Sequence, residues 1–296
     1  MIPYWALLTL ASALFFALRD VYRKKVLFKA SELEFFVAAG LLELFFVPLF
    51  LPKLELGGLA APETLLLLVA RSAIATASAF FIVQAYKNLD ASKVAPMQPL
   101  SPLLLLFLAI IFLGEQPQAK HVLGICLVIA GAYLLEYRER RWKSRLDPLK
   151  EVWRNPWSRK VLYSLVLWSF LAIIDKTLLK QINSETFYVL TTAINVSVFV
   201  GYWLARGKDP LKTAKDVAAA AGAPLFLAVF FNAAQNLAVF AALALPETMV
   251  SVLIPLRRLS AVFTVLLSGK ILKEENIASR AAAAVVMVIG SYFLVF

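Results

Sequence analysis

The chain has 296 residues, of which 61% are hydrophobic and 17% are charged. One soluble core cannot bury so much apolar surface, so the composition excludes an ordinary soluble domain and predicts a polytopic membrane protein. The formal net charge of +11 raises the question of nucleic-acid binding. However, the basic residues concentrate in connections, where tryptophans interleave with them. That mixture suits a membrane surface with anionic head groups, and no nucleic-acid partner is expected.

Ten apolar stretches follow one another with short connections, each near the length of about 20 residues that crosses a bilayer. No basic residue precedes the first stretch, so we interpret it as a retained helix and not as a cleaved signal. The predicted fold class is therefore an all-α polytopic membrane protein with ten transmembrane helices. The predicted spans are residues 3–27, 31–52, 63–86, 91–113, 119–136, 161–181, 186–205, 222–244, 247–269 and 278–296.

An internal repeat organises these spans. Residues 90–115 recur in degraded form as residues 246–274, and the closing Glu115 matches Glu274. Two copies of one unit are predicted. Because each copy holds five spans, an odd number, the second copy must run inverted through the bilayer. Inverted repeats place a site near the midplane between the copies and favour alternating access.

Three segments are predicted from this repeat. Residues 1–136 form the first repeat, residues 137–160 form a basic cytoplasmic linker, and residues 161–296 form the second repeat. Most of the 30 lysines and arginines follow odd-numbered spans. The positive-inside rule then places the odd-numbered loops in the cytoplasm and both termini outside.

The pattern A-x-K-x-L-x-A-S-x-V-A-P at residues 85–96, followed by Pro102 and the Leu-Gly-Glu of residues 113–115, resembles the EamA-like branch of the drug/metabolite transporter superfamily. The resemblance extends over nearly the whole chain and implies a ten-helix secondary transporter without a cofactor. It also implies that spans five and ten make contacts between copies or protomers, so a monomer or homodimer is expected. Family members have cytoplasmic termini, from which the uncharged ends of this chain depart.

Charged side chains inside spans are costly and are therefore candidates for function. Arg19 and Asp20 lie about two-thirds along the first span, and Asp175 and Lys176 lie at a similar fraction of the sixth. An offset of 155 pairs Asp20 with Asp175, and inverted topology would set them on opposite sides of the midplane. The alternative is that these charges reach the bilayer interface.

Glu43 lies near the middle of the second span, with apolar residues on both sides. It is expected either to take a partner such as Arg71 or Arg19, or to stay protonated and carry a coupling proton. Arg71, in the third span, is either a substrate ligand or a partner of Glu43. A structural ion pair remains open for both residues.

Arg257 and Arg258 follow Pro255 in the ninth span. The basic pair resembles the lysine-arginine pair of sugar-phosphate translocators in the same superfamily, which holds a phosphate there. Here it predicts a site for an anionic group, phosphate or carboxylate. The alternative is charge balance for Asp175 or Glu43.

Uncharged polar residues supply further candidates. Gln98 and Ser101 lie among the prolines of the fourth span, where freed backbone carbonyls can line a cavity. Asn232, Gln235 and Asn236 share one helix face in the eighth span. They serve either as ligands or as contacts between helices.

Trp168 and Tyr86 are predicted to wall the apolar part of the site, or to lie at the bilayer interface. No ATP-binding or hydrolytic motif is visible, so neither enzyme activity nor a metal is expected. The predicted function is secondary transport of a small polar metabolite, an amino acid or organic acid, across the cytoplasmic membrane, with Glu43, Asp20 or Asp175 in coupling. The alternatives are an exchanger of sugar phosphates or other phosphorylated anions, and a proton-coupled cation or drug exporter. A scaffold or lipid-modifying enzyme is disfavoured.

Overall fold

A computed structural model describes residues 2–55, 57–89, 94–136, 155–271 and 277–296. Within these ranges the chain consists of helices and connections, without strands. Six helices are long and apolar enough to cross a membrane, and three shorter apolar helices accompany them. The predicted all-α class is thereby confirmed, whereas the count of ten spans and the inverted repeat stay predictions. The linker of residues 137–160 lies largely outside the described residues.

Five long helices are uninterrupted and agree with the predicted spans to within a few residues. Apolar side chains dominate each of them, and helices are the natural solution in lipid because every interior backbone group is paired within the segment. They are α1 (Tyr4–Leu27), α3 (Pro62–Asn88), α8 (Pro156–Leu178), α9 (Ser184–Ala205) and α11 (Ala223–Ala244). Two shorter helices, α6 (Ala119–Glu136) and α14 (Ile277–Val295), also coincide with predicted spans.

Three predicted spans are broken helices, and a proline lies in or next to each interrupted segment, where it removes an amide donor. Helix α2 (Glu32–Glu43) passes into short 3₁₀ turns, η1 (Leu44–Leu49) with Pro48, η2 (Leu51–Lys53) and η3 (Gly57–Ala60). The turn η4 (Ala95–Leu100), with Pro99, precedes α5 (Ser101–Leu113). Helix α12 (Val250–Arg257), with Pro255, is separated from α13 (Ser260–Ile271).

One helix, α10 (Pro210–Ala221), lies where a loop was predicted. Its start carries ordinary helix signals: the Asp209 side chain accepts hydrogen bonds from the amides of Leu211 and Lys212, and Pro210 occupies the first turn. Gly222, with φ of +58°, ends it. The apolar-span criterion missed α10 because the helix is short and carries charges on one face.

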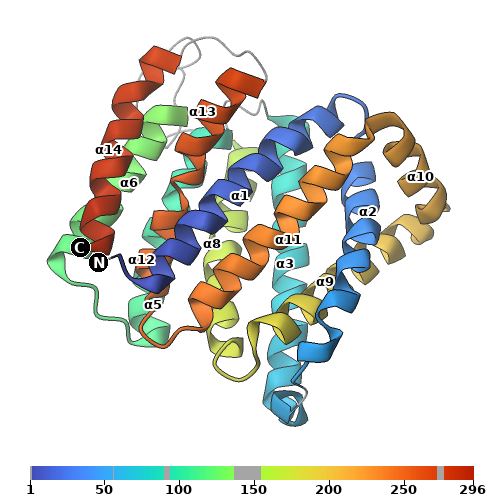
Figure 1. Cartoon of the computed structure of the whole chain (residues 1–296), viewed down its shortest axis with the longest axis horizontal. Coiled ribbons are helices and arrows are strands. Elements are labelled where there is room, and N and C mark those ends of the chain that lie inside the picture. Colours follow the sequence, from blue (N-terminus) through green and yellow to red (C-terminus); the bar gives the residue numbers. More distant parts are fainter. Residues whose placement is uncertain (1, 56, 90–93, 137–154, 272–276) are drawn as a thin grey trace.

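The helices pack mainly in three pairs, α1 with α11, α3 with α8, and α6 with α14 (Figure 1). The last pair is close because glycines face one another. A Cβ atom added at Gly124 would lie 2.7 Å from the Gly290 carbonyl oxygen. The two termini lie side by side at one end of the bundle (Figure 1). The small residues of the predicted fifth and tenth spans therefore pack these two helices tightly within one chain.

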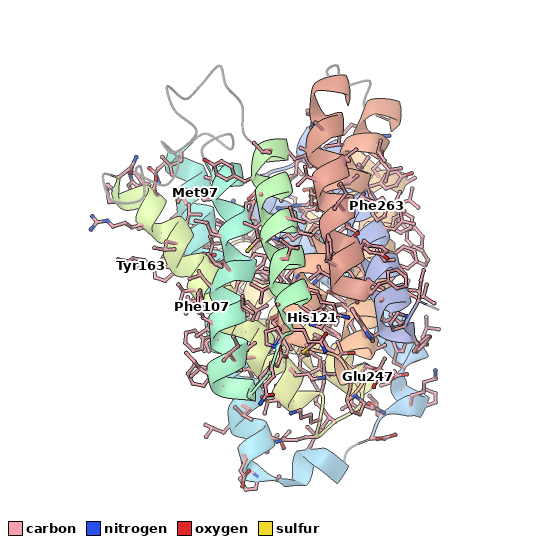
Figure 2. All side chains as sticks on the ribbon, turned by 90° about the vertical axis from the view of Figure 1, so that its left-hand side faces the viewer. Met97, Phe107, His121, Tyr163, Glu247 and Phe263 are labelled. Atoms are coloured by element: carbon pink, nitrogen blue, oxygen red, sulfur yellow. The ribbon has the colours of Figure 1, made fainter. Side chains whose placement is uncertain are left out.

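The outer surface is apolar, as a bilayer requires. Phe107 of α5 and Tyr163 of α8 point away from the bundle in Figure 2, and their residues are 58% and 50% exposed. The charges singled out from the sequence lie elsewhere, between the helices.

Candidate functional site

Glu43 ends α2, where the helix tightens into the first 3₁₀ turn. Its carboxylate accepts a hydrogen bond from the Tyr188 hydroxyl at 2.9 Å and two from the Asn232 amide nitrogen, one to each oxygen at 3.1 Å. No lysine or arginine nitrogen of the described residues lies within 4.0 Å of it. The prediction that Glu43 pairs with Arg71 or Arg19 is therefore wrong, because neutral donors surround the carboxylate.

Arg19 and Asp20, on α1, pair with each other. Arg19 donates to Asp20 Oδ1 from Nε at 3.1 Å and from Nη2 at 2.7 Å, and it reaches Asn232 Oδ1 from Nη1 at 3.4 Å. The guanidinium also lies 3.9 Å from the centre of the Phe16 ring, in cation–π geometry. Both side chains stay partly exposed, 18% for Arg19 and 33% for Asp20. Asn232 thus links this pair to Glu43.

Arg71 and Asp175 form a buried ion pair between α3 and α8, with 2.9 Å between Arg71 Nε and Asp175 Oδ1. The Nη1 atom of Arg71 is buried and has no partner within the described part of the chain. Next to this pair, Lys176 donates from Nζ to the carbonyls of Leu243 at 2.7 Å and Leu245 at 2.8 Å. Lys176 therefore stabilises the C-terminal end of α11.

The amide stripe of α11 connects the charged groups. Gln235, only 2% exposed, donates to the side-chain oxygens of Asn232, at 3.4 Å, and Asn236. The Gln235 backbone carbonyl accepts from the Ser12 hydroxyl at 2.9 Å, which joins α11 to α1. The stripe thus makes contacts between helices and contacts to charged groups at the same time.

Arg257 lies at the end of α12, where the helix breaks after Pro255. Its guanidinium donates to Gln235 Oε1 and lies 5.1 Å from the centre of the Phe16 ring. In the described residues no carboxylate oxygen lies within 4.0 Å of it, and its buried Nε has no partner. Arg257 is therefore a cation without a direct counter-charge.

Arg258 points another way, as expected for adjacent residues about 100° apart on a helix. Its Nη2 donates to the backbone carbonyl of Gln98 at 3.0 Å. The two arginines do not form one joint site here, and Gln98 contributes a freed backbone oxygen to Arg258. The Ser101 carbonyl accepts from the Ser169 hydroxyl at 3.3 Å, a contact between helices.

We call the connected set of α1, α2, α11 and α12 side chains the central polar cluster. One acidic and one basic member, Glu43 and Arg257, lack a direct opposite charge, and amides join them. Sequence reasoning missed Tyr188 and Phe16, because neither ring type stands out in an apolar span. The members of the cluster are Arg19, Asp20, Glu43, Asn232, Gln235 and Arg257.

Trp168 lies on α8 and is 54% exposed. Its neighbours on the same helix face include the buried Ser164, Leu171 and Asp175 and the partly exposed Ala172. The ring therefore lies at the surface of the bundle, as in the alternative that places it at the bilayer interface. The other predicted aromatic residue, Tyr86, has a side chain outside the described part of the structure.

A second set of charges holds the turn between α11 and α12. Glu115, after α5, accepts from the backbone amides of Val250 at 2.6 Å and Ser251 at 3.0 Å, and from the Ser251 hydroxyl. Together with Lys176, it fixes the turn between α11 and α12 from both sides. Among the described residues, no group of three or more histidine, cysteine or acidic side chains could hold a metal ion.

A bundle of apolar helices that buries a connected set of charges is the architecture of a multi-pass membrane protein with a polar interior. Residues 3–137 match the model of the EamA-like transporter family. The match covers slightly less than half of the chain and confirms, over that segment, the resemblance to EamA-like transporters of the drug/metabolite transporter superfamily.

Similarity to other known proteins lies in the fold. No curated protein matches the chain significantly. Among solved structures 28 chains match, and one of them, described only as a crystal structure of a protein, superposes with a TM-score of 0.69. The match covers 99% of this chain and 96% of that one at 14% sequence identity. At that identity the likeness shows a shared fold alone.

Proposed function

We propose that this protein is a transporter that moves a small metabolite with a carboxylate, an amino acid or organic acid, across the cytoplasmic membrane by alternating access. The observation that carries the proposal is the pair of charges without direct counter-ions, Arg257 and Glu43. A buried charge is costly unless it is paired. A solute carboxylate on Arg257, together with an amine or a proton on Glu43, would supply both missing charges.

The surroundings of the two charges support a dipolar solute. Asn232 and Gln235 offer amide groups between them, and Phe16 lies against both Arg19 and Arg257. In this proposal Asp20 and Glu43 carry coupling, whereas Asp175, already paired with Arg71, positions α8 against α3.

Two inverted five-helix repeats, residues 1–136 and 161–296 joined by the linker 137–160, form the second part of the proposal. In the two copies, α1 corresponds to α8, and α3 corresponds to α11. The contact of α1 with α11 therefore corresponds to the contact of α8 with α3, and both contacts are present in the structure. In the same way, the contact of α1 with α13 corresponds to that of α8 with α5, which is also present. Pairwise correspondence of this kind is what a pseudo-two-fold relation requires.

The state of the bundle fits one step of alternating access. Hydrogen bonds of Glu115 and Lys176 hold the turn between α11 and α12, which supports a closed arrangement at this end. At the opposite end, a pocket lined in part by Asp20 opens next to the central polar cluster. The charge distribution of the loops supports a cytoplasmic location for that open end.

The test is transport in proteoliposomes. Purified protein is reconstituted and supplied with labelled amino acids, organic acids, sugar phosphates and quaternary amines, with and without a proton gradient. We expect flux of an amino acid or organic acid, and Arg257→Gln should reduce it about 10- to 100-fold because a charged hydrogen bond to the solute is lost. Arg206→Gln is the matched control, since Arg206 lies at the end of α9 and stacks on Tyr202.

Two other results would replace this proposal. Flux of phosphorylated anions alone would identify a phosphate exchanger, with Arg257 and Arg258 as its ligands. Flux of quaternary amines that follows the proton gradient and survives Arg257→Gln would identify a cation exporter that uses Glu43 and Asp20. The basic pair and the isolated carboxylate, respectively, are the features that keep these alternatives open.

A further inference from the structure

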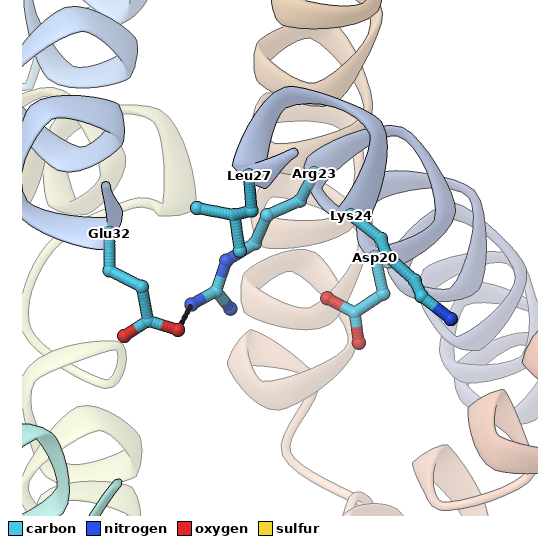
Figure 3. A pocket seen from close by; sticks show the side chains of 5 residues that line it. All are labelled: Asp20, Arg23, Lys24, Leu27 and Glu32. Atoms are coloured by element: carbon cyan, nitrogen blue, oxygen red, sulfur yellow. Dashed lines mark hydrogen bonds and ion pairs between the residues drawn. The ribbon is translucent and has the colours of Figure 1, made fainter. Parts of the chain in front are cut away.

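A pocket of about 260 Å³ lies between the last turns of α1 and the first turn of α2 (Figure 3). Two acidic, two basic and one apolar side chain line it, and Figure 3 shows them around a common space. Four of the five are therefore charged, in equal numbers of each sign. They are Asp20, Arg23, Lys24, Leu27 and Glu32.

Two aromatic rings and one long ion-pair contact hold the Arg23 side chain, and one of its donor atoms has no partner among the described residues. Its Nη2 reaches Glu32 Oε1 at 3.4 Å, a long contact, and its guanidinium lies 5.7 and 5.4 Å from the ring centres of Phe35 and Phe36. Its Nε atom is buried without a partner in the described part of the chain. Aromatic rings hold this guanidinium beside the pocket that it lines, where it provides a preorganised anchor for a carboxylate.

Asp20 connects the pocket to the central polar cluster. It lines the pocket on one side and accepts from Arg19 on the other. Arg19 in turn reaches Asn232, which donates to Glu43. Asp20 therefore belongs to both the pocket and the cluster, and a solute in the pocket would be separated from Asn232 and Glu43 by the Arg19–Asp20 ion pair.

We propose that this pocket is an outer solute site, which binds a small zwitterion with an amine and a carboxylate before it reaches the central polar cluster. The carboxylate of the solute binds Arg23, its amine lies between Asp20 and Glu32, and its aliphatic part contacts Leu27. Two carboxylates in the lining repel a phosphate dianion, so the balanced charge selects against phosphorylated solutes. The identity of the solute rests on the proposed function, whereas the location of the site does not.

The test is a labelling measurement that needs no transport. Leu27→Cys is introduced together with Cys126→Ser, which removes the single native cysteine, and the rate of maleimide reaction at position 27 is followed in lipid nanodiscs. L-leucine is the probe, and inorganic phosphate and tetramethylammonium at equal ionic strength are the comparators. We expect L-leucine alone to slow labelling. Lys24→Cys serves as a second reporter in case the first variant folds poorly.

Variants then locate the site. Arg23→Gln should raise the half-protecting concentration of L-leucine about tenfold, whereas Lys25→Gln, next to the pocket but not lining it, should leave that concentration unchanged. Protection should persist in Glu43→Gln/Arg257→Gln, which removes the two charges of the central polar cluster that lack a direct counter-charge and that do not line the pocket.

Three outcomes would overturn the proposal: equal protection by phosphate, no protection by L-leucine at either reporter, or loss of protection in Glu43→Gln/Arg257→Gln. Protection by L-leucine without amino-acid flux in proteoliposomes would instead contradict the proposed function and leave the outer site standing.

Discussion

At the scale of single residues, the Arg71–Asp175 ion pair is expected to have a structural role, which a pair of substitutions can test. Both partners are buried and joined at 2.9 Å. Arg71→Met or Asp175→Leu alone leaves one buried charge unpaired, which should cost about 3–5 kcal/mol of stability. Combining the two should restore most of the melting temperature in detergent, and transport with it. If the double variant melts normally but stays inactive, one of the two residues binds solute or carries a coupling proton.

Which residues matter was easier to predict than which residues they contact. Charges in apolar spans are rare, so Arg19, Glu43 and Arg257 stood out in the sequence. Their partners depend on how helices far apart in the chain pack together. Tyr188 and Asn232 took the place of the expected arginine at Glu43 because α9 and α11 lie beside α2. Nothing in an apolar span marks one tyrosine for that contact.

At the scale of elements, the packing of α6 on α14 depends on glycine. A Cβ at Gly124 would approach the Gly290 carbonyl oxygen to 2.7 Å, a backbone atom that cannot turn away. Gly124→Ala should therefore lower stability by about 1–3 kcal/mol, measured as a lower melting temperature in detergent. Gly201→Ala in α9 is the control, because its Cβ meets nothing within 4 Å and alanine favours a helix by about 1 kcal/mol. Equal melting of both variants would show that the α6–α14 contact is looser than described.

Hydrophobic stretches predicted where helices form, and prolines indicated where a helix can be interrupted. The prolines of the fourth span indicated freed backbone, and η4 occupies that position. The breaks after Glu43 and Arg257 also involve prolines, Pro48 and Pro255, but a single proline does not reveal whether a helix bends or stops. Tertiary packing decides between the two. Helix α10 was missed because a search for membrane spans passes over short amphipathic helices.

At the scale of the whole molecule, the distribution of basic residues and the position of the termini make a joint prediction. Most lysines and arginines follow odd-numbered predicted spans, and Phe28 lies in the connection after the first of them. The two termini lie near the other end of α1 (Figure 1). The positive-inside rule then places Phe28 in the cytoplasm and Lys180, between α8 and α9, outside. Both residues are exposed. Single cysteines there, in a Cys126→Ser chain, can therefore report the orientation.

In intact cells, a membrane-impermeant maleimide should label Lys180→Cys at once and Phe28→Cys only after permeabilisation. Cysteine-free Cys126→Ser protein is the control for background labelling. The opposite pattern would place the termini in the cytoplasm, as in the family that the sequence resembles. The pocket beside Arg23 would then face the outside of the cell. Because the pocket lies at the end of α1 next to Phe28, this single result also assigns the side of the membrane that the pocket faces. An outward-open pocket would make the site beside Arg23 a capture site for uptake, and an inward-open pocket would make it a capture site for export.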